Sequence, residues 1–345
     1  MGATVLSGGR ARSQTALHIP DGYLSPTTCA ALYAGAAPFW YVSLQRMKRA
    51  FNTQMVPLLS VFAAFSFIIM MFNLPLPGGT TGHAVGVGIA TIVLGPWASI
   101  LGISIALIIQ AVFFGDGGIT AIGANCFNMA IVGSLATYAI YRGLAGRSAI
   151  TSVRRVVAAG VAGYVAINLA ALAAAIEFGI QPLLYHDASG APLYAPYPLR
   201  IAIPAMMIGH LTIAGLAEMV VSAGVVAYLQ KSEPGLLKRT APGAVEDRPA
   251  VGSLRHLWFA LAVLLILTPL GILATGSAWG ESPPSPMPRG LKALSSFWTA
   301  PMPGYAPPFL KSPAFGYLLS AMTGTGLILL LILLAGWMFR GRTRG

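Results

Sequence analysis

The feature that most constrains this chain is a series of long apolar runs that contain few or no charged residues. A helix needs about 20 apolar residues to cross about 30 Å of hydrocarbon. Candidate runs lie at 26–45, 54–74, 83–94, 96–114, 118–141, 156–180, 200–230, 256–275 and 314–339. Because 56% of the residues are hydrophobic and only 9% are charged, we expect an all-α, multi-pass membrane protein.

The stretch 83–114 does not fit a simple span. It is too long for one upright crossing and too short for two full ones, and Gly95-Pro96 interrupts it. The sequence therefore predicts a short broken helix followed by a full one, and nine crossings in total.

The basic residues give a second view of the topology, because Lys and Arg in short loops favour the cytoplasmic side of a membrane. With the N-terminus outside and the C-terminus inside, most of the 21 basic residues become cytoplasmic. These are Arg46, Lys48, Arg49, Arg142, Arg147, Arg154, Arg155, Lys231, Lys238, Arg239, Arg248, Arg255, Arg340, Arg342 and Arg344. The positive charge is thus explained by topology, and we expect no nucleic-acid partner.

The same pattern divides the chain into four parts. Residues 1–16 form a leader without an apolar stretch, and 17–230 form a core of seven membrane segments. A cytoplasmic linker rich in Pro, Gly and charge follows at 231–255. Residues 256–345 form a two-helix tail, whose extracytoplasmic loop 277–313 is expected to lie on the membrane surface or to cover the core.

Two histidines are candidates for metal binding. His18 and His83 are both predicted at the outer side, each beside a turn rich in Pro or Gly. Imidazole is the commonest nitrogen ligand for Ni, Cu and Zn. Spacing alone leaves the alternative that both are ordinary interfacial histidines.

Three polar residues could support such a site. The carboxylate of Asp21 could accept the second ring N–H of a liganding histidine, or it could merely close a local turn. Asn125 and Asn128 lie one helical turn apart and need buried partners. They could brace helix packing or hold the loop of the metal site.

The stretch Leu17–Pro26, Leu-His-Ile-Pro-Asp-Gly-Tyr-Leu-Ser-Pro, resembles the N-terminus of the NikM/CbiM family. These proteins are the substrate-binding membrane subunits of nickel and cobalt energy-coupling-factor importers. The segment 268–281, Thr-Pro-Leu-Gly-Ile-Leu-Ala-Thr-Gly-Ser-Ala-Trp-Gly-Glu, together with the last helix, resembles the long forms that carry a NikN-like tail. The resemblance covers essentially the whole chain from Leu17.

The resemblance implies a nearly planar site of four nitrogens. The ligands would be the amine of Leu17, the backbone amide and ring of His18, and the ring of His83. Such a plane suits Ni(II) and excludes tetrahedral Zn(II). The Ile-Pro-Asp-Gly variant is more similar to nickel members than to cobalt members, so Ni²⁺ is expected as the transported substrate and Co²⁺ as the second choice, with no catalytic cofactor.

Sixteen residues precede Leu17, so the chain as printed has no free amine there. Bacterial genes can start at TTG or CTG, codons that encode Leu internally and Met at initiation. We therefore expect the protein to start at position 17. The competing explanation is proteolytic removal of residues 1–16.

The resemblance also implies partners in the bacterial cytoplasmic membrane: a CbiQ/NikQ-like transmembrane coupling subunit and CbiO/NikO-like ATPases. The chain itself has no Walker phosphate loop and no metallohydrolase motif, so we expect a transporter subunit and not an enzyme. One alternative is a stand-alone secondary metal carrier, which would use Glu177 and Glu218 along its path. Another is an intramembrane metalloenzyme with Asp21 as its base.

Overall fold

The computed structural model describes residues 18–50, 55–76, 80–241, 254–273 and 284–340, so the expected leader and Leu17 lie outside the described residues. The α-helices are α1 Pro26–Ala50, α2 Met55–Met70, α3 Val87–Leu94, α4 Pro96–Ile109, α5 Ile122–Asn125, α6 Gly133–Ala145, α7 Val153–Leu184, α8 Leu199–Gly209, α9 Gly215–Ser232, α10 Arg255–Leu267, α11 Arg289–Leu294 and α12 Pro313–Arg340.

Three π-helical segments extend or join these helices. Segment η1, Gln110–Phe114, continues α4; η2, Cys126–Val132, joins α5 to α6; and η3, His210–Ala214, joins α8 to α9. Short 3₁₀ segments are η4 Pro234–Thr240, η5 Thr268–Leu273 and η6 Pro303–Tyr305. Local π-helical geometry often marks functional sites.

Five helices in the described part of the chain are long and apolar enough to cross a membrane: Pro96–Phe114, Val153–Leu184, Leu199–Ser232, Arg255–Leu273 and Pro313–Met338. The expectation of an all-α, multi-pass membrane protein is confirmed. The helix α2 is a shorter apolar helix, and α3 has only 8 residues. The count of nine crossings and the orientation stay predictions.

The predicted break after the short helix is confirmed. Helix α3 ends at Leu94 and α4 begins at Pro96, with Gly95 between them at φ 82°. Proline suits the first position of a helix, where its missing N–H would have had no intrahelical partner. Before α3, the strands β1, Leu74–Leu76, and β2, Thr80–Gly82, pair as a small antiparallel hairpin.

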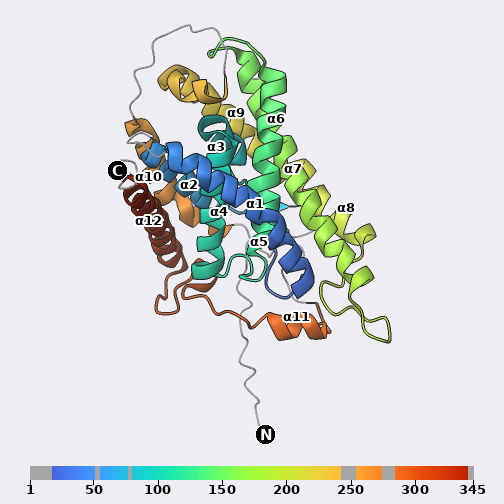
Figure 1. The fold of residues 1–345 in the computed structure, drawn as a ribbon. Helices are drawn as coiled ribbons and strands as arrows, with labels where there is room; N and C mark the ends of the chain where they lie inside the picture. Colours follow the sequence, from blue (N-terminus) through green and yellow to red (C-terminus); the bar gives the residue numbers. More distant parts are fainter. Residues whose placement is uncertain (1–17, 51–54, 77–79, 242–253, 274–283, 341–345) are drawn as a thin grey trace.

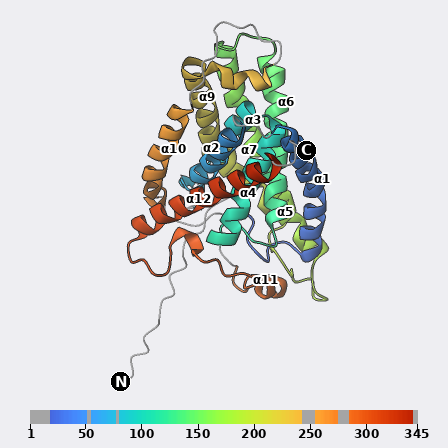
Figure 2. The same cartoon turned by 60° about the vertical axis from the view of Figure 1, so that its left-hand side comes forward.

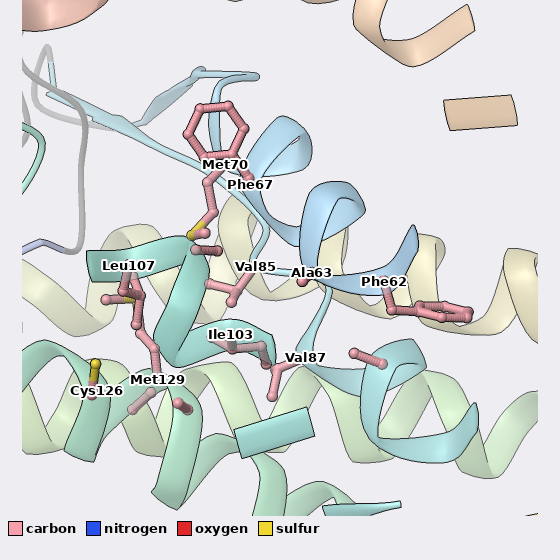
Figure 3. Close-up of a cluster of buried hydrophobic side chains, with 14 of the residues drawn as sticks. Phe62, Ala63, Phe67, Met70, Val85, Val87, Ile103, Leu107, Cys126 and Met129 are labelled. Atoms are coloured by element: carbon pink, nitrogen blue, oxygen red, sulfur yellow. The ribbon is translucent and has the colours of Figure 1, made fainter. Parts of the chain in front are cut away.

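The interior of the molecule is a core of packed helices with a flank on each side. Helix α7 packs against α6, α8 and α9 along one flank (Figure 1). Helices α10 and α12 pack against α2 on the other side (Figure 2). Between these flanks, Phe67 and Met70 of α2 lie near Leu107 of α4 and Met129 of η2 (Figure 3). Close packing of this kind stabilises helices where lipid provides no hydrophobic driving force.

The connections gather at the two ends of the helical body. In both views the short helix α11 lies at one end, and the connection between α6 and α7 lies at the opposite end (Figures 1 and 2). The turn that precedes α1 is also at the α11 end. That end brings together the residues from which the site is built.

Candidate metal centre

The turn before α1 is held by a buried amide. The side chain of Asn125 accepts a hydrogen bond from the Ile19 N–H at 2.8 Å and donates one to the Ile19 carbonyl at 3.2 Å. The Gly118 N–H also donates to the Ile19 carbonyl, at 2.9 Å. These bonds fix the backbone directly after His18, so Asn125 lies at the expected site.

The ring of His18 is buried and bound to a carboxylate. Its Nδ1 lies 2.5 Å from Oδ1 of Asp116, and both side chains are almost fully buried. A carboxylate accepts, so Nδ1 carries a proton, and in the neutral ring Nε2 keeps its lone pair. Nε2 has no hydrogen-bond partner. A histidine that donates one ring N–H to a carboxylate is typical of metal sites.

Asp116 was not among the residues singled out from the sequence. It follows η1 in the segment Gly-Asp-Gly-Gly, 115–118, where the chain turns back toward α5. Gly117 adopts φ +84°, and a Cβ there would lie 3.2 Å from the Cβ of His18 and 2.9 Å from Nδ2 of Asn125. A lone carboxylate among glycines between two apolar runs is the signal that could have found it.

His83 reaches the same place from the loop between β2 and α3. The centroids of the His18 and His83 rings are 5.2 Å apart, with the planes tilted by 51°. Nδ1 of His83 lies 3.1 Å from the Ala84 carbonyl, which can only accept, so Nε2 again keeps the lone pair. Nε2 of His83 is buried and has no hydrogen-bond partner. The structure thus brings the two predicted histidines together.

Burial, and to a lesser degree the nearby His18, lower the pKa of His83 to about 3. The ring is therefore neutral across the physiological range, which is the form that binds a metal.

Glu218 of α9 fixes the loop that carries His83. Its carboxylate accepts hydrogen bonds from the N–H groups of Val85 and Gly86 at 2.8 Å each, and of Gly88 at 3.0 Å. A carboxylate at a helix N-terminus satisfies otherwise unpaired N–H groups and complements the helix dipole. The start of α3, and with it the position of His83, depends on this contact.

Two of the expected supporting residues lie elsewhere. Asp21 accepts from the Thr120 N–H at 2.8 Å, the Thr120 hydroxyl at 2.6 Å and the Ile119 N–H at 3.2 Å, so it braces the start of α5 and does not contact a histidine ring. The carboxylate that takes the ring N–H is Asp116 instead. Asn128 donates to Glu177 at 2.8 Å, as a contact between helices.

The buried rings can give two imidazole nitrogens to a divalent transition metal. Within the described residues, no group of three or more His, Cys, Asp or Glu side chains is arranged to hold a metal ion. A metal ion with square-planar or tetrahedral coordination needs four ligands. Further ligands must therefore come from other groups.

The comparisons with known proteins agree with this chemistry. Residues 18–236 match the family model described as "Cobalt uptake substrate-specific transmembrane region", CbiM. The chain is 53% identical over 337 residues to the fused nickel transport protein NikMN of Rhodobacter capsulatus, covering 90% of this chain and 95% of that relative. It is 33% identical over 279 residues to the cobalt transport protein CbiM of Geobacter sulfurreducens, covering 78% and 75%. A crystal structure of a transition metal transporter matches 62% of this chain and 92% of its own, with 50% identity and a TM-score of 0.58.

Proposed function

Because this chain belongs to the CbiM family of cobalt-uptake substrate-specific transmembrane proteins, we propose that it captures a nickel or cobalt ion for import. The observation that carries the proposal is the pair of buried rings of His18 and His83, 5.2 Å apart, each with an unpartnered Nε2. Leaving such atoms buried without a partner costs free energy unless a ligand occupies the site.

The remaining ligands are the amine of Leu17 and the amide nitrogen of His18. These become available when the chain begins at position 17, either by initiation there or by removal of residues 1–16. Together with the two rings they form a planar set of four nitrogens, which favours Ni(II) over Zn(II). Leu17 lies outside the described residues.

Loading in this form turns the ring of His18. A chelate that uses the amide and the ring of the same histidine closes through Nδ1, because Nε2 lies on the far side of the ring from the backbone. Half a turn about the Cβ–Cγ bond puts Nδ1 toward the metal and places Nε2–H beside the position that Nδ1 holds now. Asp116, at present 2.5 Å from Nδ1, would accept this N–H after a small shift of its carboxylate.

Nickel is the first substrate and cobalt the second. The fused NikMN relative is named for nickel transport, and its similarity extends over 90% of this chain, including the tail. The CbiM relative is named for cobalt transport and is less similar, at 33% identity. The site is proposed to face the extracytoplasmic side, with the N-terminus outside and the C-terminus inside.

Import is proposed to depend on a CbiQ/NikQ-like membrane subunit and on CbiO/NikO-like ATPases, as in an energy-coupling-factor importer of the bacterial cytoplasmic membrane. Helix α1 offers a docking face, because its small residues Ala30, Ala31, Ala34 and Ala37 are exposed. Small residues allow close approach between membrane helices. Residues 17–230 would form the metal-binding core, and 256–345 the tail.

The test is the metal content and visible absorption of three proteins purified from the membrane. These are a form that starts with Met at position 17, the full-length chain, and the short form with His83→Ala. We expect about one nickel with a square-planar spectrum in the short form only. Equal binding by all three, or by none, would refute the site.

A further inference from the structure

The loop before α12 returns to the metal centre from the far end of the sequence. Its Trp298 indole N–H donates to the Val112 carbonyl at 2.9 Å, and its Met302 N–H donates to the Phe113 carbonyl at 2.9 Å. Both acceptors belong to η1, whose end leads directly to Asp116. The loop is therefore bonded to the segment that supplies the carboxylate.

The same loop also meets the turn before α1. The Leu291 N–H of α11 donates to the Leu193 carbonyl at 3.0 Å. The Leu291 carbonyl lies so close to Gly22 that a Cβ there would be 2.7 Å from its oxygen. Gly22 also adopts φ +85°, which only glycine tolerates readily. The sequence left two placements for loop 277–313, and its described part, from residue 284 on, contacts the core at these positions.

Tyr305 is the point at which this loop enters the site. Its buried hydroxyl lies 2.5 Å from Oδ2 of Asp116, and Nε2 of Gln110 donates to the hydroxyl oxygen at 3.0 Å. Since Gln110 donates, the single proton of Tyr305 points to Asp116. The bonds form a directed chain, in which Gln110 donates to Tyr305 while both Tyr305 and His18 donate to Asp116.

The backbone of Tyr305 is held in a conformation that side chains rarely adopt. Its φ is 58°, and it is the one non-glycine residue with positive φ in the described part of the chain. Its ring stacks on Phe114 with centroids 4.9 Å apart, and the Ser320 hydroxyl donates to its carbonyl at 3.1 Å. Backbone strain of this kind is found at functional sites, where surrounding contacts maintain it.

We propose that Tyr305 is a positioning residue for metal capture, through which the C-terminal loop orients Asp116 and thereby His18. This inference rests on the proposed function. With Tyr305 in place, both oxygens of Asp116 have a donor, so the carboxylate cannot rotate away from the histidine. Without the hydroxyl, Oδ2 loses its bond to Tyr305, and the carboxylate that accepts the ring N–H of His18 is held less firmly.

The experiment uses the form that starts with Met at position 17. Tyr305→Phe removes one oxygen and keeps the ring that stacks on Phe114. Partners of this kind typically change metal affinity by about 10- to 100-fold, so we expect the nickel dissociation constant to rise by roughly 10-fold, mainly through faster release to a chelator. Tyr317→Phe is the matched control, because the Tyr317 hydroxyl is also buried in the tail but donates to the Met71 carbonyl at 2.8 Å. We expect nickel affinity to be unchanged in this control.

A double-mutant cycle separates positioning from a general loss of stability. Asp116→Asn alone should weaken nickel binding, and adding Tyr305→Phe to it should weaken binding little further, because the hydroxyl acts through the carboxylate. Additive losses, or a Tyr305→Phe variant that releases nickel as slowly as the control, would overturn the inference. If the unsubstituted short form binds no nickel, the proposed function fails and this inference fails with it.

Discussion

Glu218→Gln tests how strongly the loop that carries His83 depends on one carboxylate. Oε2 of Glu218 accepts the N–H groups of Val85 and Gly86, and Oε1 accepts that of Gly88. Glutamine has one carbonyl oxygen, which can keep the first two bonds. Its NH₂ group would then face the Gly88 N–H, so two donors would meet.

The size of the effect follows from these three bonds. A hydrogen bond to a charged group contributes about 1.5–3 kcal/mol, and a neutral one about 1 kcal/mol. One charged bond is lost in Glu218→Gln and two become neutral, so the free energy of unfolding should fall by about 3–5 kcal/mol. Since Gly88 belongs to the first turn of α3 and His83 precedes it by a few residues, nickel affinity should fall as well.

Glu177→Gln is the matched control. Glu177 is also buried, but its carboxylate accepts a hydrogen bond from the Asn128 side chain at 2.8 Å, and the glutamine oxygen can keep this bond. We expect a loss of about 1 kcal/mol. Unfolding can be followed by titration with SDS in mixed micelles, using a thiol-reactive dye, because Cys29 and Cys126 are free and buried.

The variants Glu218→Gln and Glu177→Gln also distinguish the importer hypothesis from the hypothesis of a stand-alone carrier. A carrier that moves its ion past both carboxylates requires both, so each substitution would abolish uptake. The structure instead assigns Glu218 to a helix terminus and Glu177 to Asn128. Equal losses of stability and of metal binding in Glu177→Gln and Glu218→Gln would refute this reasoning.

Three further predictions concern the turn around His18. Gly117→Ala should lower the free energy of unfolding by about 1–3 kcal/mol and abolish nickel binding, because φ is +84° and the new Cβ would press on His18; thermal unfolding with and without nickel measures both effects. Asn125→Ala should cost about 2–3 kcal/mol by removing both bonds to Ile19, and Asn125→Asp should cost at least as much in the same assay, because its second oxygen would face the Ile19 carbonyl. Nickel affinity should rise from pH 6 to pH 8, because an α-amine with a pKa of about 8 must lose its proton, whereas His83, with a pKa of about 3, is already neutral. A flat profile in chelator competition would exclude the amine as a ligand.

The sequence predicted the parts of this structure that depend on local pattern. Apolar length indicated the membrane helices, and Gly95-Pro96 marked the break between α3 and α4. His18 and His83 were identified because each is a strong ligand type beside a turn, and their rings are 5.2 Å apart in the structure. Their binding of a metal stays a prediction.

The partners of these histidines could not be predicted in the same way. Asp21 and Asp116 are both carboxylates beside turns, and composition does not distinguish which of them bonds His18. Asp21 is the carboxylate closer to His18 in the sequence, but it accepts hydrogen bonds from the N–H groups of Thr120 and Ile119 instead. The choice depends on how η1 folds back over the N-terminal turn, which is a tertiary contact between residues 98 positions apart.

The same consideration explains why the tail matters to a centre whose expected ligands all lie within the first quarter of the chain. The bond from Tyr305 to Asp116 joins residues 189 positions apart, and Gln110 and Tyr305 are 195 apart. A chain that ends before the C-terminal loop would keep His18, His83 and Asp116 but leave Oδ2 of Asp116 without the Tyr305 hydroxyl. The core therefore contains the proposed ligands, whereas the tail contributes a donor to the carboxylate that orients one of them. In this long form, metal retention should depend on an intact tail, and its loss should resemble Tyr305→Phe more closely than His83→Ala.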